Sequence, residues 1–351
     1  MAAAAPTTTK TIRLKCNLDA GAPTREHFNI EETPAPVLDS SAAGAILVQA
    51  LVFSADPFQR GQLRTGRGKS AGDVMTGFIA GKVLQSNNDK WAVGDLFGAS
   101  LPFSTVQVVT SEELSATTIW KLTGVITEDQ ISLGVGILGM PGSTAYGGLI
   151  DILQPKAGQT LFVSAASGAV GSLVGQIGKK VYGCKVVGSC GGPDKCAIVK
   201  DKFGFDASVD YKLANNSRDA LAAQLKEVAP EGVDMYFENV GGIHFDVAFA
   251  ALRRFGRIAV CGAISGYNEE KPPANEVNIG AMIYSFQRIE GFMCSPWLSG
   301  QKGNFLEDMA KWWREGKLQV QETFFEGVEA WPDAFNSLFT GKNLGKVVVR
   351  V

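Results

Sequence analysis

The pattern of hydrophobic residues changes character near residue 130. Before that point, short apolar segments alternate with turn residues. Residues 45–53 and 73–84 are expected to be strands, and a turn at 93–98 leads into a third. Short strands separated by glycine-rich turns are typical of a β-barrel or β-sandwich. The first 130 residues are therefore predicted to form a β-rich domain.

After residue 130, strand-like and helix-like segments alternate. A short apolar strand at 160–164 is followed by residues 169–182, where apolar residues recur at helical spacing up to Gly183, which can end the helix. Further strands are expected at 185–189, 207–211, 233–237, 257–261 and 288–292, and further helices at 194–203, 217–228 and 244–252. This alternation predicts an α/β fold with a doubly wound parallel sheet.

The C-terminal part contains a predicted helix at 304–316 and a strand at 347–351, which is expected to return to the first domain. The predicted domains are thus residues 1–130 with 305–351, and residues 131–304. Residues 131–150 carry no charge, but six glycines and one proline favour a buried segment over a transmembrane helix. The first ten residues lack the features of a secretory signal, so a cytoplasmic location is expected.

Composition narrows the possible functions. The 33 basic and 35 acidic residues give a net charge of -2, which offers no positive excess for nucleic acid or acidic membranes. Only two histidines are present, and none of the six cysteines stands in a CxxC spacing. A zinc site is therefore not expected. Scattered cysteines in a chain of this length fit a reducing cytosol better than a disulfide framework.

Residues 164–171, with the sequence Ser-Ala-Ala-Ser-Gly-Ala-Val-Gly, lie between the predicted strand and helix. They form an A-x-G-x-x-G variant of the dinucleotide-binding fingerprint. Gly168 allows the backbone to approach a pyrophosphate, and Gly171 allows close packing of the helix on the strand. Amides at the helix start, near Ala169, Val170 and Gly171, can bind phosphate oxygens. This segment predicts a dinucleotide cofactor rather than a structural turn.

The end of the next strand indicates which dinucleotide is bound. An NAD site favours an acidic residue there, which holds the ribose 2′-hydroxyl. This chain instead has Gly-Ser-Cys-Gly-Gly at 188–192, with Lys195 shortly after. Ser189, exposed amides and a lysine suit a 2′-phosphate, so NADPH is predicted over NADH. Asp194 is interpreted as the N-cap of the following helix.

At this point the chain resembles the zinc-independent medium-chain dehydrogenase/reductases. The resemblance is to the branch of leukotriene B4 12-hydroxydehydrogenase, prostaglandin reductase and plant alkenal double-bond reductases. The segments that carry it are 54–60, 139–146, 165–176, 236–242, 260–268 and 341–346. The runs Asn-Val-Gly-Gly at 239–242 and Cys-Gly-Ala-Ile-Ser-Gly-Tyr-Asn at 261–268 are specific to this branch.

The resemblance implies a GroES-like β-rich catalytic domain, a Rossmann domain with an NADP(H) site, and a homodimer. By similarity, the cofactor contacts are Gly168, Ala169, Val170, Gly171, Ser172, Ser189, Lys195, Tyr211, Asn239, Cys261, Gly262, Ala263, Ile264, Ser265, Tyr267, Phe292, Met293, Cys294 and Asn343. The structural alternatives are a surface position for Lys195, turn or core roles for Asn239, Cys261 and Asn343, and a strand-end aromatic for Tyr211.

The expected chemistry follows from the cofactor. Hydride adds to the β-carbon of an α,β-unsaturated carbonyl, and the resulting enolate needs a hydrogen-bond donor and then a proton at the α-carbon. Tyr267 is the candidate catalytic donor. The alternative is that Tyr267 only packs against the cofactor ribose and that water supplies the proton.

Two positions of the predicted substrate pocket depart from many plant relatives. Phe58 and Phe78 stand where those relatives carry tyrosine, so the pocket is expected to be more apolar and to favour hydrophobic enones or quinones. The sequence thus predicts an NADPH-dependent reductase of enals and enones. A quinone reductase is the alternative on the same scaffold. A protein that holds NADPH without turnover is a third interpretation, against which Tyr267 and the full-length catalytic domain argue.

Overall fold

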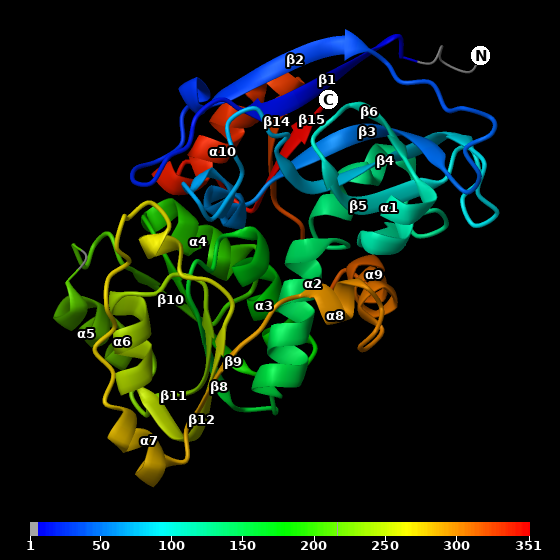
Figure 1. Ribbon diagram of the computed structural model, residues 1–351. Coiled ribbons are helices and arrows are strands. Elements are labelled where there is room, and N and C mark those ends of the chain that lie inside the picture. Colours follow the sequence, from blue (N-terminus) through cyan, green and yellow to red (C-terminus); the bar gives the residue numbers. More distant parts are fainter. Residues whose placement is uncertain (1–5, 216) are drawn as a thin grey trace. The chain divides into compact units, whose positions relative to one another are not determined.

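Two large β-sheets organise the protein, as seen in a computed structural model that describes residues 6–215 and 217–351 (Figure 1). The chain divides into two units. Unit 1 comprises the chain up to Met140 together with Glu322–Asn343 and Val347–Val351, and unit 2 comprises Pro141–Gln321 and Leu344–Lys346. The predicted class, a β-rich domain together with a doubly wound parallel sheet, is confirmed.

Unit 1 contains a seven-stranded sheet of order β14-β15-β3-β4-β5-β7, with β6 also pairing with β3, and a separate antiparallel hairpin of β1 and β2. The strands are β1 (Thr8–Leu14), β2 (Phe28–Pro34), β3 (Ile46–Ala55), β4 (Thr76–Ser86), β5 (Leu96–Pro102), β6 (Val106–Val109), β7 (Ile119–Lys121), β14 (Glu322–Glu326) and β15 (Lys346–Arg350). The helical segments are η1 (Arg25–His27), η2 (Pro57–Leu63), α1 (Ser111–Ala116), η3 (Glu128–Val135), η6 (Val328–Ala330) and α10 (Trp331–Thr340).

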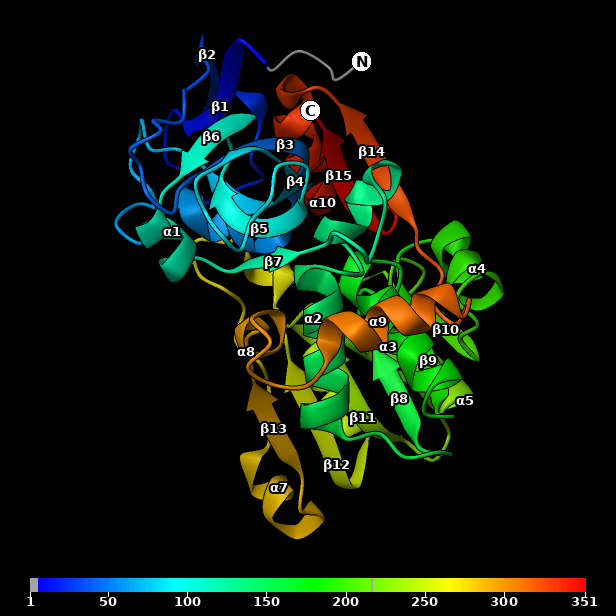
Figure 2. The ribbon, with the colours of Figure 1, turned by 90° about the vertical axis from the view of Figure 1, so that its right-hand side faces the viewer.

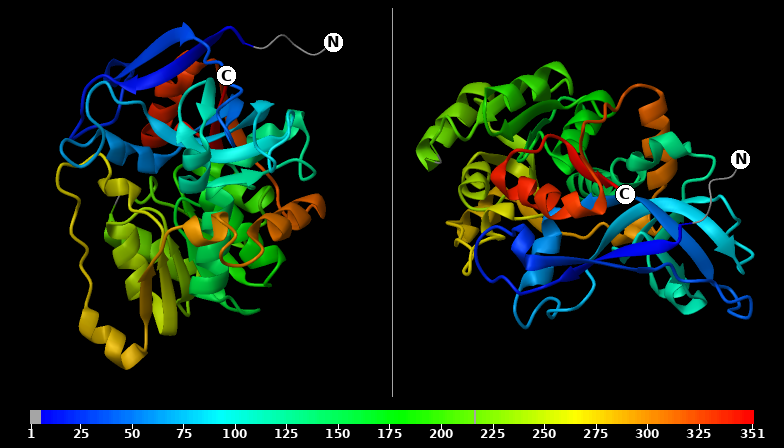
Figure 3. Two further views of the ribbon diagram at one scale, coloured as in Figure 1. Left: turned by 45° about the vertical axis from the view of Figure 1, so that its right-hand side comes forward. Right: turned by 90° about the horizontal axis from the view of Figure 1, so that it is seen from above.

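The core of unit 1 contains residues from both the N-terminal and the C-terminal parts of the described chain. Figure 3 shows the red C-terminal strand β15 and helix α10 beside the blue N-terminal strands. The fully buried Trp331 packs against Phe103 and Phe335, with ring centroids 5.2 and 5.0 Å apart. Its indole N–H donates to the backbone oxygen of Ser54 over 3.0 Å, so the one polar atom of this large side chain is satisfied inside the core.

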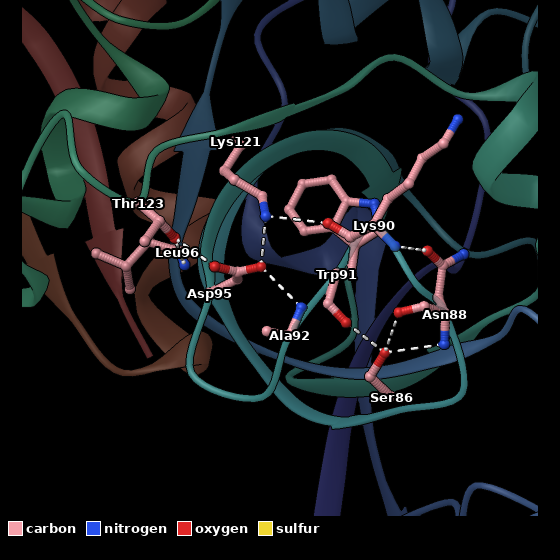
Figure 4. A network of polar contacts seen from close by, with 9 residues as sticks. All are labelled: Ser86, Asn88, Lys90, Trp91, Ala92, Asp95, Leu96, Lys121 and Thr123. Atoms are coloured by element: carbon pink, nitrogen blue, oxygen red, sulfur yellow. Dashed lines mark hydrogen bonds and ion pairs between the residues drawn. The ribbon is translucent and has the colours of Figure 1, made fainter.

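A polar network fixes the turn between β4 and β5 (Figure 4). The carboxylate of Asp95 accepts hydrogen bonds from the Lys121 ammonium at 2.6 Å, the Ala92 amide at 2.8 Å and the Thr123 hydroxyl at 2.9 Å. Burial alone would raise the pKa of Asp95, but these donors outweigh it and lower the pKa. The charged carboxylate thus anchors this end of the sheet.

Unit 2 contains a six-stranded sheet of order β10-β9-β8-β11-β12-β13, in which every pair is parallel. The strands are β8 (Thr160–Val163), β9 (Lys185–Cys190), β10 (Ala207–Asp210), β11 (Val233–Glu238), β12 (Leu252–Val260) and β13 (Arg288–Gly291). The helical segments are α2 (Met140–Gly147), η4 (Gly148–Leu153), α3 (Ala169–Lys180), α4 (Pro193–Asp201), α5 (Arg218–Val228), α6 (Ile243–Ala250), η5 (Ile264–Gly266), α7 (Ile279–Ser285), α8 (Ser295–Leu298) and α9 (Phe305–Arg314).

Helices cover both faces of the unit 2 sheet, with α5 and α6 on one side and α3 on the other (Figure 1); Figure 2 shows the side covered by α3. Phe162 and Tyr236, stacked with centroids 5.1 Å apart, belong to one apolar cluster with residues of α5 and α6. Leu161, one residue earlier on β8, faces helix α3 at Gly178, where a Cβ would come within 2.7 Å of the leucine side chain. Successive residues of a strand point to opposite faces, so a continuous apolar run is buried on both sides.

The units differ from the predicted domain boundaries at both junctions. Residues 305–321 lie in unit 2 because helix α9 and the segment after it bond within that unit. The Tyr146 hydroxyl donates to Asp308 at 2.7 Å, and the Gln319 amide donates to the side chain of Gln176 at 2.7 Å. Residues 131–140 lie in unit 1, where Gly134 is held closely between Leu122 and Ala80.

Candidate cofactor-binding site

The predicted phosphate loop connects β8 to α3, as the motif requires. Gly168 is the N-cap of α3 and has no side chain to cap the helix, so the first amides of the helix point outward from its N-terminus. Gly171 leaves no room for a side chain, because a Cβ there would lie 2.4 Å from the backbone oxygen of Ala165. Ala165 itself adopts the left-handed conformation, with φ of +49°. Close packing of α3 on the sheet is provided further along by Gly175 and Gly178, which face Phe205 and Leu161.

A segment distant in sequence joins this loop. The amide of Gly345 donates to the backbone oxygen of Ser167 at 2.8 Å, and Gly345 bridges Gly168 in parallel. Gly345 has φ of +65°, and a Cβ there would meet the backbone oxygen of Gln321. Sequence analysis did not identify Gly345, although it lies in the quoted segment 341–346. The predicted contact Asn343 stands two residues before it.

The end of β9 gathers the groups predicted for the ribose phosphate. The Ser189 hydroxyl is buried and lies 3.0 Å from Nε2 of His244, whose ring meets that of Tyr211 edge-on with centroids 5.3 Å apart. Burial lowers the pKa of His244 to about 4, so this imidazole is neutral near pH 7. His244 was not among the predicted site residues. His244 and Ser189 are 55 positions apart in the sequence, so the spacing of residues in a motif does not reveal their contact.

Lys195 lies on the first turn of α4, which follows β9, and is half-buried. Burial lowers its pKa, and the charge of Lys212 lowers it further, which places two ammonium groups near each other. Like charges held together are stabilised by an anion, and a phosphate ester is the anion for which this pair is suited. Lys212, which directly follows the predicted contact Tyr211, is a second residue that sequence analysis missed.

The interpretation of Asp194 as a helix cap is wrong. The N-cap of α4 is Gly192, with φ of +100°, and Pro193 and Asp194 occupy the first helical positions. Glycine fits because the chain must turn through a positive φ, and proline fits the first helical position. The amide of Gly192 donates to Asp210 at 2.9 Å, which ties this turn to the end of β10.

The carboxyl ends of β11 and β12 carry the next group of predicted residues. The side-chain amide of Asn239 donates to the backbone oxygen of Ser164 at 2.7 Å, and its backbone amide donates to the Ser164 hydroxyl at 2.9 Å. Asn239 therefore links this strand end to the phosphate loop. The Ser265 hydroxyl donates to the backbone oxygen of Val240 at 2.6 Å, so the turn after β12 is bound to the loop after β11.

Tyr267 ends this turn and is half-buried. Its hydroxyl oxygen accepts a hydrogen bond from the Ala263 amide at 3.3 Å. A Cβ on Gly262 would come within 3.1 Å of that oxygen, so the ring closes back over its own loop. Burial raises the pKa of Tyr267, and the nearby Cys261 and Glu238 raise it further against the opposing hydrogen bond. The phenol is therefore protonated near pH 7.

The end of β13 supplies Phe292, Met293 and Cys294. Phe292 packs edge-on against Phe237 and Trp297, with centroids 5.9 and 6.0 Å apart, whereas Met293 is 76% exposed. Burial, with the neighbouring Cys294, raises the pKa of the Cys261 thiol to about 12. The ends of β12 and β13 thus lie side by side.

Most of the predicted cofactor contacts in unit 2 lie at the carboxyl ends of the six parallel strands or in the loops that follow them. They therefore gather along the side of the sheet where these strands end. This side is where open α/β sheets bind ligands. The remaining predicted residues Gly262, Ile264 and Ser172 lie on the same loops, with Ser172 already inside helix α3.

Phe58 and Phe78 belong to unit 1. Phe58 lies on η2, is 44% exposed and meets Phe78 of β4 edge-on with centroids 6.0 Å apart. Phe78 in turn lies 6.3 Å from the ring of Trp120. The structure therefore brings the two predicted substrate-pocket residues together in an aromatic group.

The described part of the chain, residues 6–215 and 217–351, contains neither a metal-ligand cluster nor a helix that could span a membrane. No group of three His, Cys, Asp or Glu side chains in that part of the chain could hold a metal ion. No helix there is long and apolar enough to cross a membrane.

Comparison with known proteins places this geometry in a family. Residues 10–117 match the family described as N-terminal domain of oxidoreductase, and residues 169–310 match the family described as zinc-binding dehydrogenase. Prostaglandin reductase 1 of Bos taurus is 39% identical over 331 residues, which cover 94% of this chain and 95% of that protein. The 2-alkenal reductase (NADP(+)-dependent) of Nicotiana tabacum is 36% identical, with 95% of each chain covered.

A solved structure agrees with the sequence relatives. CurA from Vibrio vulnificus in complex with NADPH superposes with a TM-score of 0.84 at 35% identity, covering 97% of this chain and 99% of that one. The chain belongs to the medium-chain dehydrogenase/reductases, in the zinc-independent branch that contains the prostaglandin and alkenal reductases.

Proposed function

We propose that this protein is an NADPH-dependent reductase of the carbon–carbon double bond of α,β-unsaturated aldehydes and ketones. The names of the relatives support this activity, since they include a prostaglandin reductase and an NADP(+)-dependent 2-alkenal reductase. The observation that carries the cofactor assignment is the N-terminus of α3, capped by Gly168 after β8, together with the position of Lys195 in the first turn of α4 after β9.

The residues present fit NADPH at both of its charged ends. Backbone amides at the start of α3 suit the pyrophosphate, and Gly171 keeps that turn free of side chains. Lys195 and Lys212 suit the 2′-phosphate, beside the neutral His244. When bound, NADPH supplies the hydride that adds to the β-carbon of the substrate.

Tyr267 is proposed as the hydrogen-bond donor to the substrate carbonyl. Its raised pKa keeps the hydroxyl proton in place at neutral pH, so the group can stabilise negative charge that develops on the oxygen. The α-carbon then takes a proton from Tyr267 or from water. The other predicted cofactor contacts, from Asn239 to Asn343, and the substrate-pocket assignment of Phe58 and Phe78, stay predictions.

The test is NADPH oxidation with a linear enal, a cyclic enone and a benzoquinone, with product analysis by mass spectrometry. We expect the saturated aldehyde and ketone as products, and slower turnover of the quinone. Formation of an allylic alcohol would contradict reduction of the double bond. Quinone turnover alone would favour the quinone reductase, and tight NADPH binding without any oxidation would favour a non-catalytic binding protein.

Tyr267→Phe tests the proposed donor. We expect kcat to fall by at least about tenfold, as is usual when a positioned acid is lost, with NADPH affinity nearly unchanged. Tyr182→Phe is the matched control, because Tyr182 is half-buried like Tyr267 but follows the C-terminal end of α3, away from the phosphate loop. Unchanged turnover in the Tyr267 variant would restrict this residue to packing.

We also propose that two copies of the chain form a dimer through β13. This strand is the edge of the parallel sheet, and an unpaired edge offers backbone groups to a second copy. The preceding helix α7 exposes Ile279, Ile283 and Tyr284, each at least 72% accessible. Light scattering should give twice the 37.3 kDa of one chain. A monomer at micromolar concentration would contradict the dimer.

We propose a cytoplasmic location for the enzyme. The support is that none of the six cysteines, all within the described chain, forms a disulfide, as is usual in a reducing compartment. Cell fractionation tests this proposal, and recovery with a secreted or organelle fraction would contradict it.

A further inference from the structure

Two cysteines lie in contact at the nucleotide end of the sheet. Cys190 is the last residue of β9, and Cys196 lies on the second turn of α4, with Gly191 and Gly192 in the turn between them. Their sulfur atoms are 3.3 Å apart. A disulfide bond is about 2.05 Å long, so the sulfurs need to approach by little more than 1 Å to form one.

The same short segment carries the groups assigned to the 2′-phosphate. Lys195 directly precedes Cys196 on the helix, and its ammonium interacts electrostatically with the Cys190 sulfur. Ser189 directly precedes Cys190 on the strand. Drawing Cys196 toward Cys190 therefore moves the first turn of α4, and with it Lys195, relative to the strand end.

We propose that Cys190 and Cys196 form a reversible disulfide that weakens binding of the 2′-phosphorylated nucleotide and so switches the enzyme off under oxidation. This inference rests on the proposed function, because it assigns the thiol pair an effect on NADPH. Disulfides in the cytosol are usually transient and redox-sensing, which is the role assigned to this pair.

The chemistry requires a peroxide as oxidant. Cys196 is the more accessible sulfur, and Cys190 is only 2% exposed. Burial raises the pKa of Cys190, and the adjacent Cys196 raises it further, so Cys190 stays a thiol until its partner has reacted.

The thiolate of Cys196 attacks one oxygen of hydrogen peroxide, which breaks the O–O bond and leaves a sulfenic acid and hydroxide. The sulfur of Cys190 then displaces the sulfenic hydroxyl group, and the S–S bond forms. The two thiols together lose two electrons and two protons, and the peroxide becomes two molecules of water. A small thiol reverses the reaction by thiol–disulfide exchange.

One feature of the fold allows the movement, and a second resists it. Gly192 has φ of +100°, and a Cβ there would meet nothing within 4 Å, so the turn has room to shift. The turn is held from outside by the bond between the Gly192 amide and Asp210. Closing the disulfide would pull against that bond. The proposed disulfide is therefore expected to disturb the end of β10 as well as the start of α4.

The experiment uses the full-length protein and reads the disulfide and the nucleotide separately. Protein is treated with hydrogen peroxide, then examined by intact mass and by non-reducing peptide mapping. Binding of NADPH and NADH is measured by fluorescence titration before oxidation, after it, and after dithiothreitol. We expect loss of two hydrogen atoms, a peptide joining Cys190 to Cys196, and an increase of about tenfold in the Kd for NADPH, the size of one lost charge-assisted contact. The Kd for NADH should change less than twofold.

Variants separate this pair from the other cysteines. Cys196→Ser and Cys196→Ala should bind NADPH like the parent and lose the response to peroxide; using both guards against a folding defect in either. Cys16→Ser, which removes an exposed thiol of unit 1, should keep the full response. If the disulfide does not form, if it forms without changing the Kd for NADPH, or if the response survives in both Cys196 variants, the switch is wrong. Failure of the reduced parent protein to bind NADPH would instead refute the proposed function.

Discussion

The two parts of the proposed nucleotide site, one for the pyrophosphate and one for the 2′-phosphate, use different chemical groups. The loop after β8 uses backbone amides, glycines and no ionisable side chain within residues 164–171. The ends of β9 and β10 use the ionisable side chains of Lys195, Lys212 and His244, and the Cys190–Cys196 pair lies in the same segment without being one of the proposed binding groups. A backbone site does not respond to pH or oxidation, whereas a side-chain site responds to both. We therefore expect the proposed pyrophosphate end to provide an affinity that does not change with pH or oxidation, and the proposed 2′-phosphate end to provide selectivity and control.

Gly171→Ala should have the largest effect and should affect both nucleotides equally. The new Cβ would lie 2.4 Å from the backbone oxygen of Ala165, so the loop must shift. We expect a loss of about 3 kcal/mol in the free energy of unfolding and loss of NADPH and NADH binding together. Gly61→Ala is the control for stability, because a Cβ there would meet nothing within 4 Å. Selective loss of NADPH in the Gly171 variant would contradict the division between the two ends.

His244 should make stability depend on pH. Its pKa is about 4 in the folded protein against 6.5 ordinarily, so between these values the unfolded chain binds more protons. Stability is therefore present above pH 6.5 and is lost as the pH falls toward 4, by up to about 3 kcal/mol. Urea unfolding from pH 7 to 4 should show a shallower loss for His244→Gln than for the parent protein. Parallel curves for the two proteins would contradict a neutral, buried His244.

Lys195→Ala should weaken the binding of NADPH and leave the binding of NADH nearly unchanged. Loss of one charge-assisted contact is expected to cost about 2 kcal/mol of NADPH binding. Lys212→Ala should cost less, since Lys212 is exposed, and the double variant should be non-additive because each ammonium affects the other. Lys200→Ala, an exposed lysine near the end of the same helix, is the control. Equal loss for both nucleotides would remove Lys195 from the phosphate site.

Ala165→Gly should have the smallest effect and the opposite sign. Ala165 has φ of +49°, which glycine adopts at lower cost, so the variant should gain about 1 kcal/mol in stability. Ala197→Gly on the exposed face of α4 should instead lose about 1 kcal/mol. Thermal unfolding of the two variants compares them directly. Destabilisation by Ala165→Gly would show that the loop is not strained there.

The sequence predicted elements with a local signal more accurately than elements that depend on distant packing partners. The strand and helix of the phosphate loop were predicted at 160–164 and 169–182 and lie at Thr160–Val163 and Ala169–Lys180. Most other strands of the parallel sheet were located with similar accuracy, because apolar runs and helical spacing are local signals. The exception is β12, which begins at Leu252 and not at the predicted residue 257. The β1–β2 hairpin, α7 and α10 were not predicted, since their residues are fixed by packing partners distant in the chain.

The sequence by itself determined the order of strands and helices, the phosphate loop and the family, because each depends on residues close together along the chain. Only the tertiary structure placed His244 against Ser189, Gly345 on the phosphate loop and Cys190 against Cys196. Those contacts arise where the carboxyl ends of separate parallel strands meet. That meeting is set by burial of the whole sheet and not by any short stretch of residues.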